Sequence, residues 1–126
     1  MRLPVLFLSL LPAPAIADGL ALPSGRDATL QEAFWQGPEE VDGDWLRLRF
    51  VTPGLVAEGW EGSLPDLEFL CDTVALGLLA ETGRHADLIM ISLADRPSEF
   101  GQIDPDLVQF IEAFRPDEGH CTVEGF

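Results

Sequence analysis

The clearest hydrophobic pattern in the chain is an alternation of apolar and polar positions in the segment DWLRLRFV. In an extended backbone Leu46, Leu48 and Phe50 lie on one side, and Arg47 and Arg49 lie on the other. A period of two residues is typical of a strand with one face in the core. We therefore predict a strand whose apolar side is buried and whose other side carries the two arginines.

A helical period follows between Ser63 and Gly83. Ser63 is expected to cap the helix, with Pro65 in its first turn, and Gly83 suits a left-handed stop. Apolar side chains recur at intervals of three and four residues, which places them on one stripe facing the core. The stripe contains Leu67, Leu70, Cys71, Val74 and Leu78.

A second apolar strip lies on another side of the same helix and contains Phe69, Leu76 and Ala80. Exposed patches of this kind are uncommon on monomers, so either another segment of the chain covers the strip or a partner does. Coverage by the chain itself is the preferred interpretation. If a partner binds instead, Phe69, Leu76 and the loop residue Trp60 are the expected contact residues.

The C-terminal third of the chain predicts strands. DLIMISLA is a nearly continuous apolar run that ends at DRP, as in a buried central strand. Residues 104–115 fit either a helix capped by Asp104 or a strand. A hairpin is preferred, because Gly119 suits a turn and the segment from Cys121 onward needs a strand partner.

The segment TLQEAFWQGP carries a local helix signal. Thr29 and Glu32 have the spacing of a capping box, and Gly37 with Pro38 is a stop signal, which predicts a short helix over Leu30–Gln36. An extended conformation fits the segment nearly as well.

These elements predict a single α+β domain. Its expected architecture is one main helix packed on a mostly antiparallel sheet of about four strands, with a C-terminal β-hairpin.

The N-terminal run LPVLFLSLL is shorter than the ~20 apolar residues that a membrane-spanning helix needs. It follows Arg2 and precedes small residues at Ala15 and Ala17, which is the pattern of a secretory signal peptide cleaved before Asp18. We therefore expect residues 1–17 to be a signal peptide, residues 18–126 to form the domain, and the mature protein to be periplasmic or secreted.

The charge balance restricts the possible partners. The formal net charge is −15, and it becomes −16 when Arg2 leaves with the signal peptide. Such a surface repels phosphate backbones and anionic lipid headgroups, which disfavours nucleic acid and membrane partners. Lys and Tyr are absent, so the chain has no lysine for a Schiff base and no tyrosine acid.

Export also decides how Cys71 and Cys121 are interpreted. An even number of cysteines in a small exported domain indicates a disulfide. We expect a buried Cys71–Cys121 bridge that joins the core face of the helix to the last strand, and this requires the two Cα atoms to lie within about 7 Å.

The motifs ISLADRPSEFG and FIEAFRPDEGHCTVEGF, together with LPSG near the start of the mature chain, resemble a family of small exported bacterial proteins of unknown function. The resemblance covers most of the mature chain. It implies the hairpin and the disulfide, and it implies no activity, cofactor or catalytic residue.

The candidate chemistry is sparse. His85 and His120 match no metal-ligand spacing, and the acidic runs PEEVDGD and EFGQIDPD lack the ligand order of a calcium loop. No catalytic, cofactor-binding or metal-binding residue is therefore assigned. At the end of the buried strand, Arg96 and Glu99 form a possible ligand clamp, although Arg96 is more simply expected to pair with Asp95 or Glu99 and stabilise the turn.

Two functions remain. The preferred hypothesis is a non-enzymatic protein-binding or inhibitory module of the cell envelope, with an envelope protein as its partner and no cofactor. The alternative is a small carboxylate-dependent or metal-dependent hydrolase that works through its acidic residues.

Overall fold

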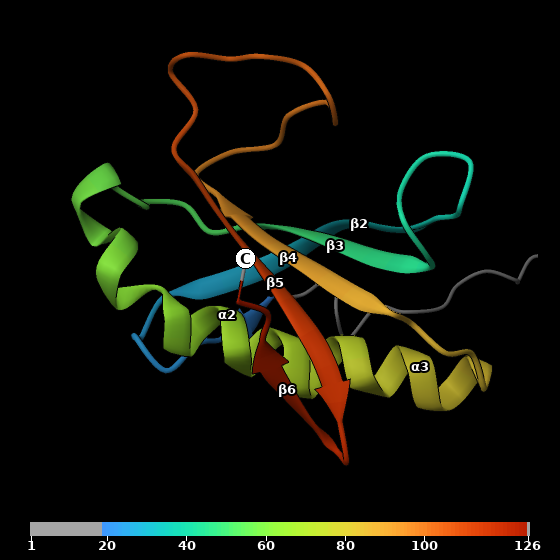
Figure 1. The fold of residues 1–126 in the computed structure, drawn as a ribbon. Helices are drawn as coiled ribbons and strands as arrows, with labels where there is room; N and C mark the ends of the chain where they lie inside the picture. Colours follow the sequence, from blue (N-terminus) through green and yellow to red (C-terminus); the bar gives the residue numbers. More distant parts are fainter. Residues whose placement is uncertain (1–18, 126) are drawn as a thin grey trace, which may run out of the picture.

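The computed structural model describes residues 19–125. They form a six-stranded sheet in which the strands lie side by side in the order of the sequence, β1-β2-β3-β4-β5-β6 (Figure 1). The strands are β1 Leu20–Ala21, β2 Asp27–Gln36, β3 Trp45–Val51, β4 Leu88–Ala94, β5 Gln109–Asp117 and β6 His120–Val123. The predicted signal peptide lies outside the described residues.

The sheet is mixed. β3 and β4 are parallel, whereas every other neighbouring pair is antiparallel. A parallel pair needs a crossover, and the predicted main helix provides it. The α+β class is confirmed, but the sheet has more strands than the expected four, because the segments on both sides of Arg26 also pair as strands.

The helix is one continuous rod made of α2 Leu64–Leu70, a π turn named η3 Cys71–Ala75, and α3 Leu76–Thr82. It lies across one face of the sheet (Figure 1). Gly83 ends it with φ of 66°, the left-handed conformation that glycine adopts without steric cost. Leu67, Leu70 and Val74 of the predicted stripe are buried in the core.

β3 confirms the predicted alternation. Leu46, Leu48 and Phe50 are buried against the helix, and each faces an apolar residue of β4 across the parallel ladder. The β4 partners are Ile89, Ile91 and Leu93, which are fully buried. The core therefore lies between the helix and one face of the sheet.

The short helix predicted for Leu30–Gln36 is wrong, because this segment is part of β2. Thr29 pairs with Val51 in the sheet, and Glu32 bonds to Arg49 instead of closing a capping box. Pairing along the whole length of β3 provides more hydrogen bonds than two helical turns would, so tertiary context overrides the local signal.

The predicted cap at Ser63 is also wrong in detail. Ser63 precedes α2, but its hydroxyl donates to the carbonyl of Trp60 at 2.6 Å and makes no capping bond to the helix. The residues before it, Ala57–Gly62, form a short 3-10 helix, η2, whose last carbonyls compete for this hydroxyl.

The C-terminal hairpin is confirmed, and the helical alternative for residues 104–115 is wrong. β5 and β6 pair antiparallel around Glu118 and Gly119, whose φ angles are 52° and 90°. Two successive positive φ angles are what a tight hairpin turn requires, and glycine supplies one of them without strain.

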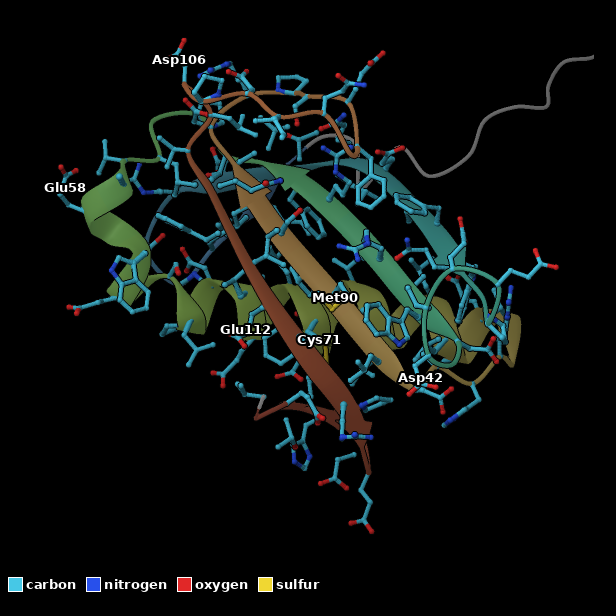
Figure 2. All side chains as sticks on the ribbon, turned by 45° about the horizontal axis from the view of Figure 1, so that its top comes forward. Asp42, Glu58, Cys71, Met90, Asp106 and Glu112 are labelled. Atoms are coloured by element: carbon cyan, nitrogen blue, oxygen red, sulfur yellow. A yellow bond between two sulfur atoms is a disulfide. The ribbon has the colours of Figure 1, made fainter. Side chains whose placement is uncertain are left out.

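The Cys71–Cys121 disulfide is confirmed, with the two Cα atoms 6.2 Å apart. Cys71 is fully buried and Cys121 is nearly so. Figure 2 shows the sulfur of Cys71 between the helix and the strands. The last strand is thereby fastened to the middle of the helix, as the position of Cys71 on the core stripe predicts.

Among residues 19–125, no helix is both long and apolar enough to cross a membrane. The acidic residues Asp42, Glu58 and Asp106 lie apart from one another at the periphery: Figure 2 shows Asp42 and Asp106 on loops and Glu58 on η2.

Candidate functional site

The face of the sheet opposite the helix carries a small cluster of polar residues. Arg47 and Arg49 point to this face because they alternate with the buried residues of β3. The register of the ladder then brings Ser92 of β4 beside Arg49, and Ile111 of β5 beside Ser92. Side chains from three neighbouring strands, β3, β4 and β5, therefore form one continuous surface, which we call the floor.

The segment between β4 and β5 covers this floor. The ring of Phe100 lies over both arginines, with its centroid 4.8 Å from the Cζ of Arg47 and 5.5 Å from that of Arg49. It also meets the edge of Phe34 at 5.0 Å between ring centroids. Stacking of a guanidinium on an aromatic face stabilises the loop in this position.

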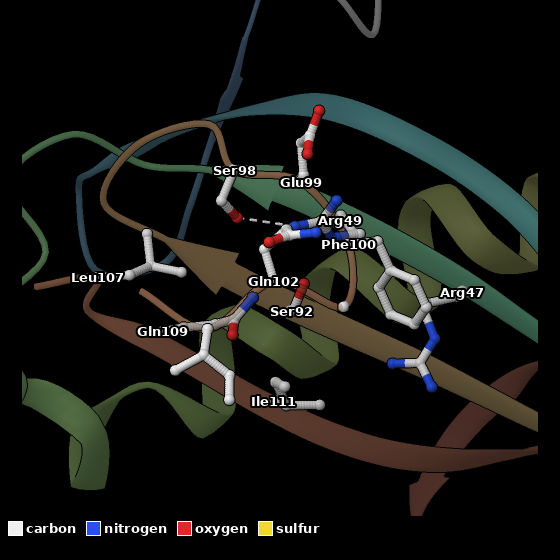
Figure 3. Close-up of a pocket in the computed structure, with 12 residues that line it drawn as sticks. Arg47, Arg49, Ser92, Ser98, Glu99, Phe100, Gln102, Leu107, Gln109 and Ile111 are labelled. Atoms are coloured by element: carbon white, nitrogen blue, oxygen red, sulfur yellow. Dashed lines mark hydrogen bonds between the residues drawn. The ribbon is translucent and has the colours of Figure 1, made fainter. Parts of the chain in front are cut away.

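Floor and loop enclose a pocket of about 290 Å³ (Figure 3). We call it the arginine pocket. It is lined by Arg47, Arg49, Ser92, Ser98, Glu99, Phe100, Gly101, Gln102, Ile103, Leu107, Gln109 and Ile111.

Arg49 is fixed inside the protein, because its side chain is only 5% exposed and both ends of its guanidinium are engaged. Nη1 forms an ion pair with Glu32, and Nη2 donates to the hydroxyl of Ser98 at 2.8 Å. A buried charge needs such compensation. Arg49 therefore joins β2, β3 and the covering loop, and its charge is largely neutralised.

Arg47 is in a different situation. It is half-buried, its Nε donates to the amide oxygen of Gln36 at 3.0 Å, and within residues 19–125 it forms no ion pair with a carboxylate. Burial lowers the pKa of Arg47 below its usual value, and the neighbouring charge of Arg49 lowers it further. An anion beside its guanidinium would counter both effects.

Ser92 forms part of the pocket floor and is 4% exposed. Its hydroxyl has no hydrogen-bond partner in the described part of the chain, although Figure 3 shows it directed into the pocket. Thr52 and Ser63, which are buried to a similar degree, donate to the carbonyls of Asp27 and Trp60. A buried hydroxyl without a partner is therefore unusual in this molecule.

Arg96 and Glu99, the two residues of the predicted ligand clamp, do not contribute to the same site. Arg96 donates to Asp95 at 2.8 Å and to Asp104 at 3.3 Å, so it closes the base of the covering loop. Glu99 lines the arginine pocket, but Figure 3 shows its carboxylate turned away from Arg47 and Ser92. The pairing of Arg96 with Asp95 agrees with the simpler of the two interpretations.

The residues of the predicted partner surface, Phe69, Leu76 and Trp60, also do not form one continuous surface. Phe69 and Leu76 are partly buried and pack against the hydrophobic core. Trp60 is 62% exposed on η2 and lines a second pocket of about 260 Å³ with Phe110 and Glu112. Phe69 and Leu76 do not line that pocket. This second pocket shares Ile111 with the arginine pocket.

The two histidines lie apart from the arginine pocket. His85 contacts Asp87 at 3.2 Å, and His120 occupies the first position of β6 beside the hairpin turn. In the part of the chain that the structure describes, no three side chains of His, Cys, Asp or Glu gather closely enough to hold a metal ion.

Sequence reasoning missed the arginine pocket. The available signal was the pair of arginines at alternate positions of β3, on the side opposite the core. Two adjacent cations in a chain of net charge −15 are conspicuous, but only the loop that folds over them shows that they belong to a pocket.

Comparison with known proteins places the chain in a family. It belongs to the family described as "Family of unknown function (DUF6497)", whose model matches residues 8–126. No curated protein and no solved structure matches the chain.

Proposed function

We propose that this chain is an exported, non-enzymatic binding domain of the cell envelope that recognises a protein partner through the arginine pocket. The observation that carries the proposal is the composition of the pocket. Cationic, amide, hydroxyl and apolar groups converge on one concave site whose walls are held by Arg49 and Phe100. Such convergence of a few polar groups on a formed pocket is characteristic of ligand sites.

Export is supported by two independent features. The short apolar run before Ala17 has the organisation of a signal peptide. The buried Cys71–Cys121 disulfide is a structural bond of the kind that persists in oxidising compartments.

A binding role is favoured over hydrolysis by the state of the pocket's hydroxyls. Ser98 accepts a hydrogen bond from Arg49, which does not activate it as a nucleophile. Ser92 forms no hydrogen bond with a histidine or carboxylate within residues 19–125. An activated serine needs a base within hydrogen-bond reach.

Co-purification tests the proposal. Tagged protein is expressed in an organism that carries this chain naturally, recovered from the envelope fraction, and the proteins retained with it are identified. We expect one partner at near-stoichiometric amount. Phe100→Ala should reduce its recovery, because the ring that stacks on both arginines is lost.

Trp60→Ala is the matched control, since it removes an exposed aromatic residue from a different pocket. Loss of the partner from Trp60→Ala but not from Phe100→Ala would transfer the binding site to Trp60. Absence of a stoichiometric protein partner would contradict the proposed function.

A further inference from the structure

We infer that the arginine pocket binds the carboxylate of an apolar ligand, held between the guanidinium of Arg47 and the hydroxyl of Ser92. The inference rests on the proposed function in that it specifies which chemical group the bound molecule presents to the same pocket. The shared chemistry is a carboxylate attached to a small apolar group, either in a free organic acid or at the C-terminus of a polypeptide.

The first argument comes from charge. The chain has 22 acidic and 7 basic residues, so a carboxylate is available for almost any arginine that needs one. Arg49, Arg96 and Arg115 each have such a partner. Arg26, Arg47 and Arg84 have none within residues 19–125, but Arg26 and Arg84 are exposed, whereas Arg47 is half-buried and lies beside a second cation.

The geometry of Arg47 leaves its binding edge available. The Nε–H of Arg47 donates a hydrogen bond to the amide oxygen of Gln36, and the ring of Phe100 lies against one side of the guanidinium. The terminal amino groups form no hydrogen bond in the described part of the chain. A planar guanidinium offers paired N–H groups that match the two oxygens of a carboxylate.

The second argument is independent and comes from Ser92. Its hydroxyl is buried on the pocket floor without a partner, which costs free energy unless a bound group satisfies it. Ser92 lies opposite Arg49, two pairs along the parallel ladder from the Arg47–Met90 pair. Two pairs along a ladder are roughly 7 Å and the next strand about 5 Å away, so the two Cα atoms lie roughly 8 Å apart. The long side chain of Arg47 spans part of this distance, so one small ligand can contact both side chains.

The third argument concerns the rest of the ligand. Besides its polar groups, the pocket lining contains the aliphatic side chains of Ile103, Leu107 and Ile111. A volume of about 290 Å³ lies at the lower end of the range for ligand pockets. It suits a short branched acid or the last residue of a peptide better than a large cofactor.

Charge also distinguishes a carboxylate from phosphate. The molecule carries a net charge of −15, so its field repels a dianion more strongly than a monoanion. One free arginine and one hydroxyl can compensate a single negative charge.

Two-dimensional NMR of the isotopically labelled mature protein provides the test. The probes are 4-methylpentanoate, inorganic phosphate, and two otherwise identical short peptides that end in leucine, one as the free acid and one as the amide. We expect saturable shifts at Arg47, Ser92 and Phe100 with an acid-bearing probe, at a dissociation constant of about 1 mM or below. The amide peptide should bind at least about tenfold more weakly, because it lacks the charge-assisted pair.

The relative affinity of the two acid-bearing probes distinguishes the sources. Tighter binding of 4-methylpentanoate indicates a free acid, and tighter binding of the peptide acid indicates a polypeptide C-terminus. Either result supports the inference.

Variants then test the two contacts. Arg47→Gln should weaken binding of the acid by about tenfold or more, and Ser92→Ala by a smaller factor. Arg84→Gln is the control, since it removes the same charge from a residue that stacks on Trp35 at 3.8 Å, outside the pocket. Arg47→Lys keeps the charge without the planar fork, so it should bind with intermediate affinity, and it replaces Arg47→Gln if that variant does not fold.

Four results would overturn the inference. The first is equal affinity for the acid and amide peptides, and the second is tighter binding of phosphate than of either acid. The third is an affinity for the acid that is unchanged in Arg47→Gln or Arg47→Lys. The fourth is the absence of a saturable chemical-shift change up to about 10 mM acid. The two hypotheses can fail separately. If the Arg47→Gln variant still co-purifies with the protein partner, the carboxylate site is contradicted and the proposed function is not. Acid binding without any protein partner would contradict the proposed function alone.

Discussion

Asp72 and Cys121 are joined by a hydrogen bond from the amide of Cys121 to Oδ1 of Asp72, at 2.7 Å. The residue before Asp72 is Cys71, whose sulfur is bonded to Cys121. The π turn of the helix and the last strand are therefore connected twice within two consecutive residues. Because β6 forms one edge of the sheet and pairs only with β5, these two links hold that edge against the helix.

The disulfide should be a major source of stability. It closes a loop with a sequence separation of 50, which corresponds to roughly 4 kcal/mol in the chain-entropy description. We expect the double variant Cys71→Ala with Cys121→Ala to unfold about 10–20 °C below the wild type. Thermal melts of the variant, and of the wild type with and without reductant, check this. A reduced wild type with an unchanged melting temperature would contradict the prediction.

The hydrogen bond from Cys121 to Asp72 should contribute separately from the disulfide. Asp72→Ala leaves the amide of Cys121 without its acceptor, so we expect a loss of about 1–2 kcal/mol in the free energy of unfolding. Asp72→Asn retains an oxygen acceptor and should lose less. Urea denaturation of the three oxidised proteins measures both losses. Equal stability of Asp72→Ala and the wild type would show that the bond contributes nothing.

Asp87 should make stability depend on pH. Its Oδ2 accepts from the amide of Asp44 at 2.8 Å and its Oδ1 contacts His85 at 3.2 Å, and these bonds, the backbone amide first, lower the pKa of Asp87. A lowered pKa adds stability above the unfolded value of about 3.9, and this stability is lost as pH falls through the folded pKa. Asp87→Asn should therefore melt below the wild type at pH 7, and the difference should shrink in acid. A difference that stays constant from neutral to acidic pH would rule out the charge as its cause.

Glu32 should be needed to hold Arg49 inside the protein. Glu32→Gln removes the counter-charge of an arginine whose side chain is 5% exposed, while Glu32 itself is 41% exposed and water compensates in part. We expect a loss of about 1–2 kcal/mol in the free energy of unfolding, read from urea denaturation. Glu39→Gln, on the exposed loop after β2, is the control and should leave stability unchanged. A Glu32→Gln protein as stable as this control would show that Ser98 alone compensates Arg49.

The export prediction has a direct chemical test. The intact mass of protein taken from the periplasmic or secreted fraction should correspond to a chain that begins at Asp18. Recovery of protein that still begins at Met1 from that fraction would contradict cleavage.

Local sequence patterns determined the elements in which only one face is apolar enough to be buried in the core. Leu46, Leu48 and Phe50 are predictable because a strand has only two faces and the arginines between them exclude the other face from the core. The helix stripe through Cys71 is predictable for the same reason at a helical period. The disulfide follows, since the stripe directs Cys71 toward the sheet where the last strand lies.

Other features were decided only by the tertiary structure, because they depend on contacts between residues that are distant in the sequence. The segment Leu30–Gln36 is a strand because β3 is available as a partner, and no local signal reports that partner. The arginine pocket exists because Phe100, on the loop after β4, folds back over Arg47 and Arg49 of β3. Such contacts become favourable only once the whole sheet has formed and the entropy of closing the intervening loops is offset, which a local pattern of residues does not encode.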